Sequence, residues 1–122
     1  MNGVAQHVEP TVYHSSVAAR QAAVESTVAR QWNEVLLEAI RGDFARPTVH
    51  ARNLFHCAVA CFDAFAAYDE LDTTLFLGRD WQGYSCALDT ALLVIPFDDE
   101  GVREAQEMAM SYAAFRLLSH RF

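Results

Sequence analysis

Lysine is absent from this sequence of 122 residues, and all nine of its basic residues are arginines. A chain without lysine has no Schiff-base nucleophile and cannot bind phosphates in the manner of a Walker motif. The basic residues are outnumbered by sixteen acidic ones, which gives a formal net charge of −7. Because a protein that binds the backbone of a nucleic acid needs a cationic face, we expect no nucleic-acid partner.

Long apolar runs are also missing. No segment approaches the roughly 18 uninterrupted apolar residues of a membrane span, and the N-terminal sequence MNGVAQHVEPTVYHSS lacks the basic start and apolar centre of a secretory signal. The three cysteines, Cys57, Cys61 and Cys86, cannot all pair within one chain. They predict free, buried thiols in a reducing compartment, and so a cytoplasmic protein.

Hydrophobic residues make up 52% of the chain and charged residues 20%, a composition typical of one folded domain. Apolar residues at helical spacing, bounded by glycine, proline and capping residues, predict a mostly helical, all-α bundle. Its three main helices are expected at residues 16–41, 48–70 and 99–121, after an N-terminal arm at residues 1–14. Residues 71–97 contain two glycines and alternate poorly, and they predict an irregular insertion with room for one short hairpin.

The second predicted helix is the most apolar of the three. One broad face of it, expected to lie in the core, carries Leu54, Phe55, Ala58, Cys61, Phe62 and Phe65. A helix with so little polar surface is expected to be central. Three helices give it few neighbours, so part of its surface is expected to need a partner, either a missing C-terminal part of the fold or a second copy of the chain.

Polar residues follow another face of the same helix. Arg52, His56 and Asp63 are separated by four and seven residues, which aligns them along the helix. A histidine and a carboxylate can bind a metal or exchange protons, but no HxxxH or ExxH pair supports that interpretation, and His50 points about 120° away from His56. We therefore interpret Arg52, His56 and Asp63 as a buried structural polar network.

The remaining candidates for chemistry are weak. Cys57 and Cys61 are four residues apart on an apolar helix, whereas zinc knuckles place CxxC pairs on turns, so both are interpreted as small core residues. The acidic residues near positions 69–72 and 98–99 lack the spacing of an EF-hand. No GxSxG, GxGxxG or P-loop motif is present. We predict no catalytic, cofactor-binding or metal-binding residue in this chain.

Three segments together carry a family resemblance. They are PTVHARNLFH at residues 47–56, DAFAAYD at residues 63–69 and SYAAFRLLSHRF at residues 111–122. With these segments the chain resembles, over about residues 24–70 and 100–122, the N-terminal region of bacterial vanadium-dependent haloperoxidase-like proteins. These proteins group with the type 2 phosphatidic acid phosphatases. The resemblance implies that Trp32, Pro47, His50, Arg52, His56 and Asp63 are packing and polar-network residues.

The resembled family has a mostly helical double bundle, a peroxidase or acid phosphatase activity, and a site for vanadate or phosphate. That site uses Lys-x6-Arg-Pro, Ser-Gly-His and Ser-Arg-x5-His sequences. Here Arg46-Pro47 is preceded seven positions earlier by Ala39 instead of lysine, and Ser119-His120-Arg121 does not match the third sequence. No catalytic residue of the family therefore transfers to this chain, which alone is predicted to be inactive and to hold no vanadate.

Two functions remain open from the sequence. The chain is either an N-terminal scaffold portion of an oxidoreductase-like protein, completed by a C-terminal part, or a free-standing helical interaction module that associates with itself. A metal-binding bundle is a distant third.

Overall fold

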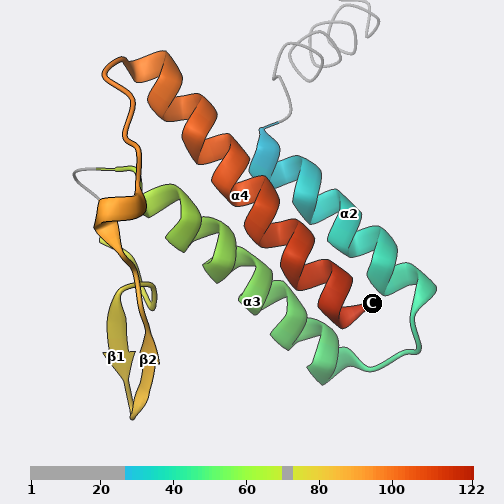
Figure 1. The fold of residues 1–122 in the computed structure, drawn as a ribbon. Helices are drawn as coiled ribbons and strands as arrows, with labels where there is room; N and C mark the ends of the chain where they lie inside the picture. Colours follow the sequence, from blue (N-terminus) through green and yellow to red (C-terminus); the bar gives the residue numbers. More distant parts are fainter. Residues whose placement is uncertain (1–26, 70–72) are drawn as a thin grey trace, which may run out of the picture.

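A computed structural model of the chain describes residues 27–69 and 73–122, and it confirms the mostly helical fold class (Figure 1). Within that part the elements are α2 (Val28–Gly42), α3 (Pro47–Ala66), β1 (Arg79–Trp81), β2 (Tyr84–Cys86), a 3-10 turn η1 (Thr90–Leu92) and α4 (Asp99–Arg121). The predicted arm at residues 1–14, the first part of the first predicted helix and Glu70 lie outside the described residues.

Helix α4 joins the three helices into one unit. Consecutive helices run in opposite directions, and α4 lies against both α3 and α2, with its most extensive contact on α3 (Figure 1). The C-terminal end of α4 therefore lies beside the connector between α2 and α3. None of the helices in the described part of the chain combines the length and the apolar character that a bilayer crossing requires.

Local sequence signals explain the limits of α2. The prediction of one continuous helix over residues 16–41 was wrong, because Thr27 has a non-helical backbone and is the N-cap of a helix that begins at Val28. The Thr27 hydroxyl accepts a hydrogen bond from the backbone N–H of Arg30, which satisfies one of the free donors of the first turn. The helix ends at Gly42, the residue expected to stop it. Along its length α2 is strongly amphipathic, and Leu36 is its fully buried residue.

Helix α3 begins one residue earlier than expected and ends four residues earlier. The sequence suggested Thr48 as the N-cap, but Pro47 occupies the first turn and Arg46 is the cap, without a side-chain hydrogen bond. Proline suits this position because its fixed φ matches the helix and its missing N–H would have no partner there. The last helical residue is Ala66, and not Glu70, because the backbone of Ala67, Tyr68 and Asp69 closes in turns.

Helix α4 matches its predicted limits, 99–121. Asp99 and Glu100 occupy its first turn, and His120 and Arg121 its last, so both ends complement the helix dipole. Asp98 is the N-cap residue, although its side chain makes no capping hydrogen bond.

The core uses a face of α3 that shares Cys61 with the predicted one but is otherwise turned away from it. Six hydrophobic residues are buried in the described part of the chain: Leu36, Cys57, Cys61, Ala66, Ala114 and Leu118. On α3 this face also includes His50 and Asn53. The expected core residues Leu54, Phe55 and Phe62 are instead 37%, 56% and 44% exposed. The prediction was wrong because α4 packs on the small side chains, which allow a close approach of two helices.

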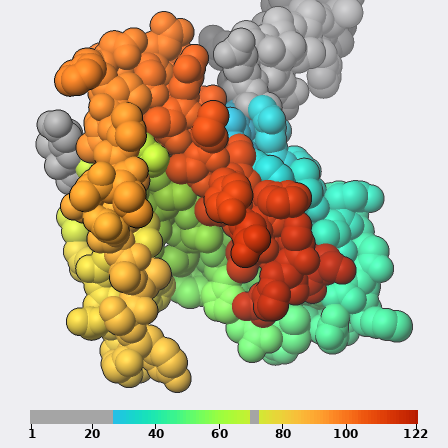
Figure 2. Space-filling view, in the orientation of Figure 1, coloured from blue at the N-terminus to red at the C-terminus, as the bar shows by residue number. Residues whose placement is uncertain are grey.

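The predicted irregular region contains one short antiparallel hairpin. Strands β1 and β2 pair Arg79 with Cys86 and Trp81 with Tyr84. Gln82 and Gly83 form the turn, both with positive φ, which gives the twist that a two-residue hairpin loop needs. The hairpin and the segment after it run alongside α3, away from α2 (Figure 2).

Candidate functional site on helix α3

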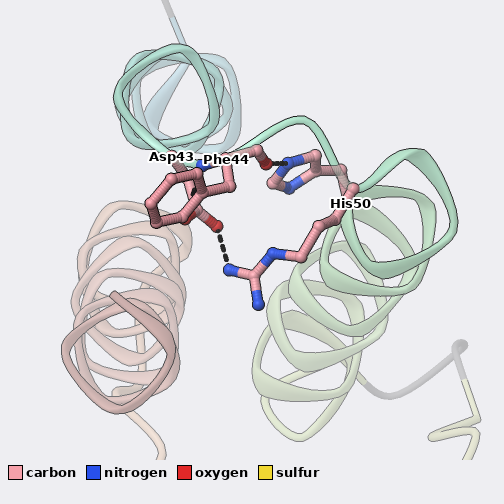
Figure 3. Close-up of polar contacts among 4 residues, drawn as sticks. Asp43, Phe44 and His50 are labelled. Atoms are coloured by element: carbon pink, nitrogen blue, oxygen red, sulfur yellow. Dashed lines mark hydrogen bonds and ion pairs between the residues drawn. The ribbon is translucent and has the colours of Figure 1, made fainter.

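The connector between α2 and α3 is organised by a short polar cluster. Arg46 donates to the Asp43 carboxylate at 2.6 Å, and the backbone N–H of Phe44 donates to the same side chain at 2.8 Å (Figure 3). These two hydrogen bonds lower the pKa of Asp43, with the Arg46 bond the larger cause. The cluster is largely open to water, so it shapes the connector without forming a pocket.

His50 attaches the start of α3 to this connector. Its Nε2 lies 2.9 Å from the backbone oxygen of Phe44 (Figure 3). A carbonyl oxygen only accepts, so Nε2 carries a proton, and in the neutral ring Nδ1 is an acceptor. Nδ1 of His50 and Oδ1 of Asn53 are both buried and lack a hydrogen-bond partner. Buried acceptors without partners are rare and costly.

Asp63 fastens the insertion to α3. Its carboxylate accepts hydrogen bonds from the backbone N–H groups of Leu75, Phe76 and Leu77, at 2.5, 2.9 and 2.9 Å. Asp63 is buried, and these three donors compensate its charge in place of an arginine. The role of this carboxylate is therefore to hold the backbone that leads into the hairpin.

His56 is held by the far end of the chain. Arg121 of α4 donates to its Nδ1 at 2.9 Å, so this nitrogen is unprotonated and accepts. Burial is the first cause of a lowered pKa at His56, and the charges of Arg121 and Arg52 add to it. The bond fixes the end of α4 against the middle of α3.

The predicted polar network of Arg52, His56 and Asp63 is thus divided among different partners. His56 and Asp63 line one shallow hollow beside Phe76, but the hydrogen bonds of Asp63 go to backbone and that of His56 goes to Arg121. Arg52 is exposed and forms no ion pair with Asp63 within residues 27–69 and 73–122. The backbone donors and Arg121 were missed because they lie 12 or more residues away in sequence.

Cys57 and Cys61 are a pair of buried thiols at the wall of a cavity between the three helices. The hydrogen bond between the two side chains lowers the pKa of Cys57 to about 7, against the effect of burial, and the same bond raises the pKa of Cys61. Both cysteines are free, as expected. Cys86 is also free but lies exposed on β2, so its predicted burial was wrong.

The cavity has a volume of about 590 Å³ and lies between α2, α3 and α4. Its walls are mainly apolar, with Val28, Ala58, Phe62, Phe65 and Met110 beside the two thiols. Polar groups at its margin are Thr27, Asn33, Arg103, Gln106 and Glu107.

No group of three or more His, Cys, Asp or Glu side chains is placed to hold a metal ion within the described ranges. The charged and polar residues discussed above hold segments of the fold together, and they are not arranged as a nucleophile with its base. No family model, no curated protein and no solved structure matches the chain.

Proposed function

We propose that the chain is a helical scaffold portion of a vanadium-dependent haloperoxidase-like protein and carries no part of the anion site. The segments PTVHARNLFH and SYAAFRLLSHRF support the resemblance, and both lie on helices of the described unit, α3 and α4. The scaffold would belong to a cytoplasmic protein. Its peroxidase or phosphatase chemistry would be performed by residues of a C-terminal part.

The observation that carries this proposal is the uncovered apolar face of α3. Leu54, Phe55 and Phe62 are three of the four leucine and phenylalanine residues on this helix, and all three are exposed, while Phe65 is half-buried. The segment 92–97 adds Leu92, Val94, Ile95 and Phe97, which are exposed as well. Monomeric proteins rarely expose contiguous apolar patches of more than a few hundred Å². Further helices of a double bundle would cover such surfaces.

The electrostatics also favour a scaffold over an anion site. Binding of vanadate or phosphate needs several converging cationic donors. The chain has no lysine and a net charge of −7. Among the described arginines, Arg41, Arg46 and Arg103 are paired with Glu38, Asp43 and Glu100 along their own segments.

The second candidate is a free-standing module that covers the same face by self-association. Sequencing of the DNA downstream of the Phe122 codon separates the two. An in-frame continuation with Lys-x6-Arg-Pro is expected for the scaffold, whereas a stop codon in the native gene would favour the module.

A dye-bromination assay with vanadate, peroxide and halide tests the missing chemistry. The purified chain is expected to give no turnover above a heat-treated control. Turnover by this chain would contradict the proposal that its residues leave the anion site to another part of the protein.

A further inference from the structure

We propose that Cys57, Cys61 and Met110 form a binding site for a soft monovalent metal ion, with Cu(I) as the biological candidate. The three residues come from two helices, α3 and α4, and all line the 590 Å³ cavity. Thiolate and thioether sulfur are the ligands that select Cu(I) over harder ions. The inference is independent of the scaffold function proposed above.

The spacing of the two thiols suits an ion with few ligands. Residues four apart on a helix have Cβ atoms roughly 5–6 Å apart on the same face. A metal–sulfur bond of about 2.3 Å allows one ion to join two sulfur atoms up to about 4.6 Å apart. Cys57 and Cys61 belong to one buried cluster, and Met110 packs against that cluster. The three sulfur-bearing side chains therefore border the same space.

The surroundings exclude the ions that need more ligands. Zinc in structural sites takes four ligands, usually Cys or His. Within the described part of the chain no three His, Cys, Asp or Glu side chains are placed to hold one metal ion. The two thiols of this cavity therefore lack the further ligands that zinc needs. Phe62 and Phe65 make the wall apolar, which disfavours strongly hydrated ions.

The charge of the bound complex is partly offset in the cavity. Binding of Cu(I) forms two thiolate–Cu bonds, from Cys57 and Cys61, and one thioether–Cu bond, from Met110. It releases the two thiol protons to water, without oxidation or reduction. The resulting dithiolate complex has a charge of −1, and the Arg103 guanidinium lines the same cavity. Glu107 also lines the cavity and adds negative charge, and Arg103 lies 3.7 Å from the Glu100 carboxylate, so Arg103 offsets only part of the negative charge at this site.

The test uses the full chain with Cys86→Ser, which removes the exposed thiol and leaves the cavity unchanged. The reduced protein is titrated anaerobically with Cu(I) against a coloured Cu(I) chelator, and in parallel with Ag(I), which is inert to oxidation. One ion per chain is expected. Cys57→Ala and Cys61→Ala should each weaken retention by about tenfold or more, and Met110→Leu by less.

A second measurement, on the chain that retains both Cys57 and Cys61, covers the case in which an alanine variant fails to fold. Bound Ag(I) should protect Cys57 and Cys61 of the Cys86→Ser chain from iodoacetamide, as mapped by mass spectrometry. The proposal is overturned if the reduced chain retains no ion, if folded cysteine variants retain it as well as the parent, or if Zn(II) binds more tightly than Cu(I). Half an equivalent per chain would also contradict it, because the ion would then bridge two copies.

Discussion

The two sides of α3 differ in a way that reverses the usual relation between side-chain size and burial. The side that packs on α4 carries His50, Asn53, Cys57 and Cys61, which are small or polar. The side with Leu54, Phe55 and Phe62 is partly exposed to water, and Phe62 also borders the open cavity between α2, α3 and α4. Small residues permit close helix packing, whereas large apolar residues provide most of the free energy of burial. The second side therefore has an unused capacity for burial.

The largest expected effect comes from the packed side of the bundle. Leu36 is fully buried on α2, and Leu36→Ala should lower the free energy of unfolding by about 2–5 kcal/mol through loss of buried area and formation of a cavity. Urea denaturation followed by circular dichroism measures it. Val35→Ala, at a half-exposed neighbouring position, is the matched control and should change stability by about 0.5 kcal/mol or less. Equal effects at both positions would contradict the assigned orientation of α2.

Asp63→Asn should have the next largest effect. The amide oxygen cannot replace both carboxylate oxygens as acceptors for Leu75, Phe76 and Leu77, so about 1–3 kcal/mol of stability is expected to be lost. Hydrogen exchange at these three amides should accelerate more than exchange within α2. Asp80→Asn on exposed β1 serves as the control and should leave the three amides protected.

Phe62→Ala separates the two sides of α3 directly. A phenylalanine in a core would cost about 3–5 kcal/mol on truncation, which the sequence-based core assignment implies. With Phe62 44% exposed, we expect about 1 kcal/mol or less for the monomer, since part of the ring already contacts water. A loss near the larger value at low protein concentration would show that Phe62 is buried.

The smallest effect is a pH dependence of the α3–α4 contact. The pKa of His56 is lowered in the folded chain, so the unfolded chain binds more protons between that pKa and about 6.5. Stability should therefore be constant above about pH 6.5 with respect to this group, and it should decrease as the pH falls towards the folded pKa.

The variants His56→Gln and Arg121→Gln test this origin. His56→Gln should remove the component of the pH profile just below 6.5, because no titrating ring remains. Arg121→Gln should reduce it, because one of the charges that lower the pKa of His56 is lost. An unchanged profile in His56→Gln would assign the effect to another group.

Features of the fold that depend on residues close together in the sequence could be predicted, and features that depend on distant residues could not. Gly42 and the acidic first turn of α4 act within one helical turn, and the end of α2 and both limits of α4 were predicted to within one residue. The start of α2 was predicted at residue 16, which was wrong, because Thr27 caps a helix that begins at Val28. The orientation of α3 depends on which helix packs against it. Apolar periodicity alone therefore pointed to Phe55 and Phe62 as core residues, which was wrong.

The polar residues His56 and Asp63 are a further case in which the partners could not be predicted from the sequence. Their spacing predicted that His56 and Asp63 lie on the same side of the helix, and both line one shallow hollow, because helical geometry is local. Their partners are backbone groups 12–14 residues away for Asp63 and a side chain 65 residues away for His56. Residue spacing within α3 carries no information about partners so far away in the sequence. The sequence therefore predicted a contact with Arg52, whereas the structure has contacts with other segments of the fold.

Sedimentation equilibrium at micromolar concentration tests the central claim, that the apolar side of α3 requires a cover, most directly. The isolated chain should associate to a dimer or larger species. The double variant Phe55→Gln/Phe62→Gln should remain monomeric with the same helix content, because both substitutions lie on the exposed side. A wild-type chain that is monomeric and unfolds in one sharp cooperative transition would contradict the claim, since it would show a small domain complete with its apolar side in water.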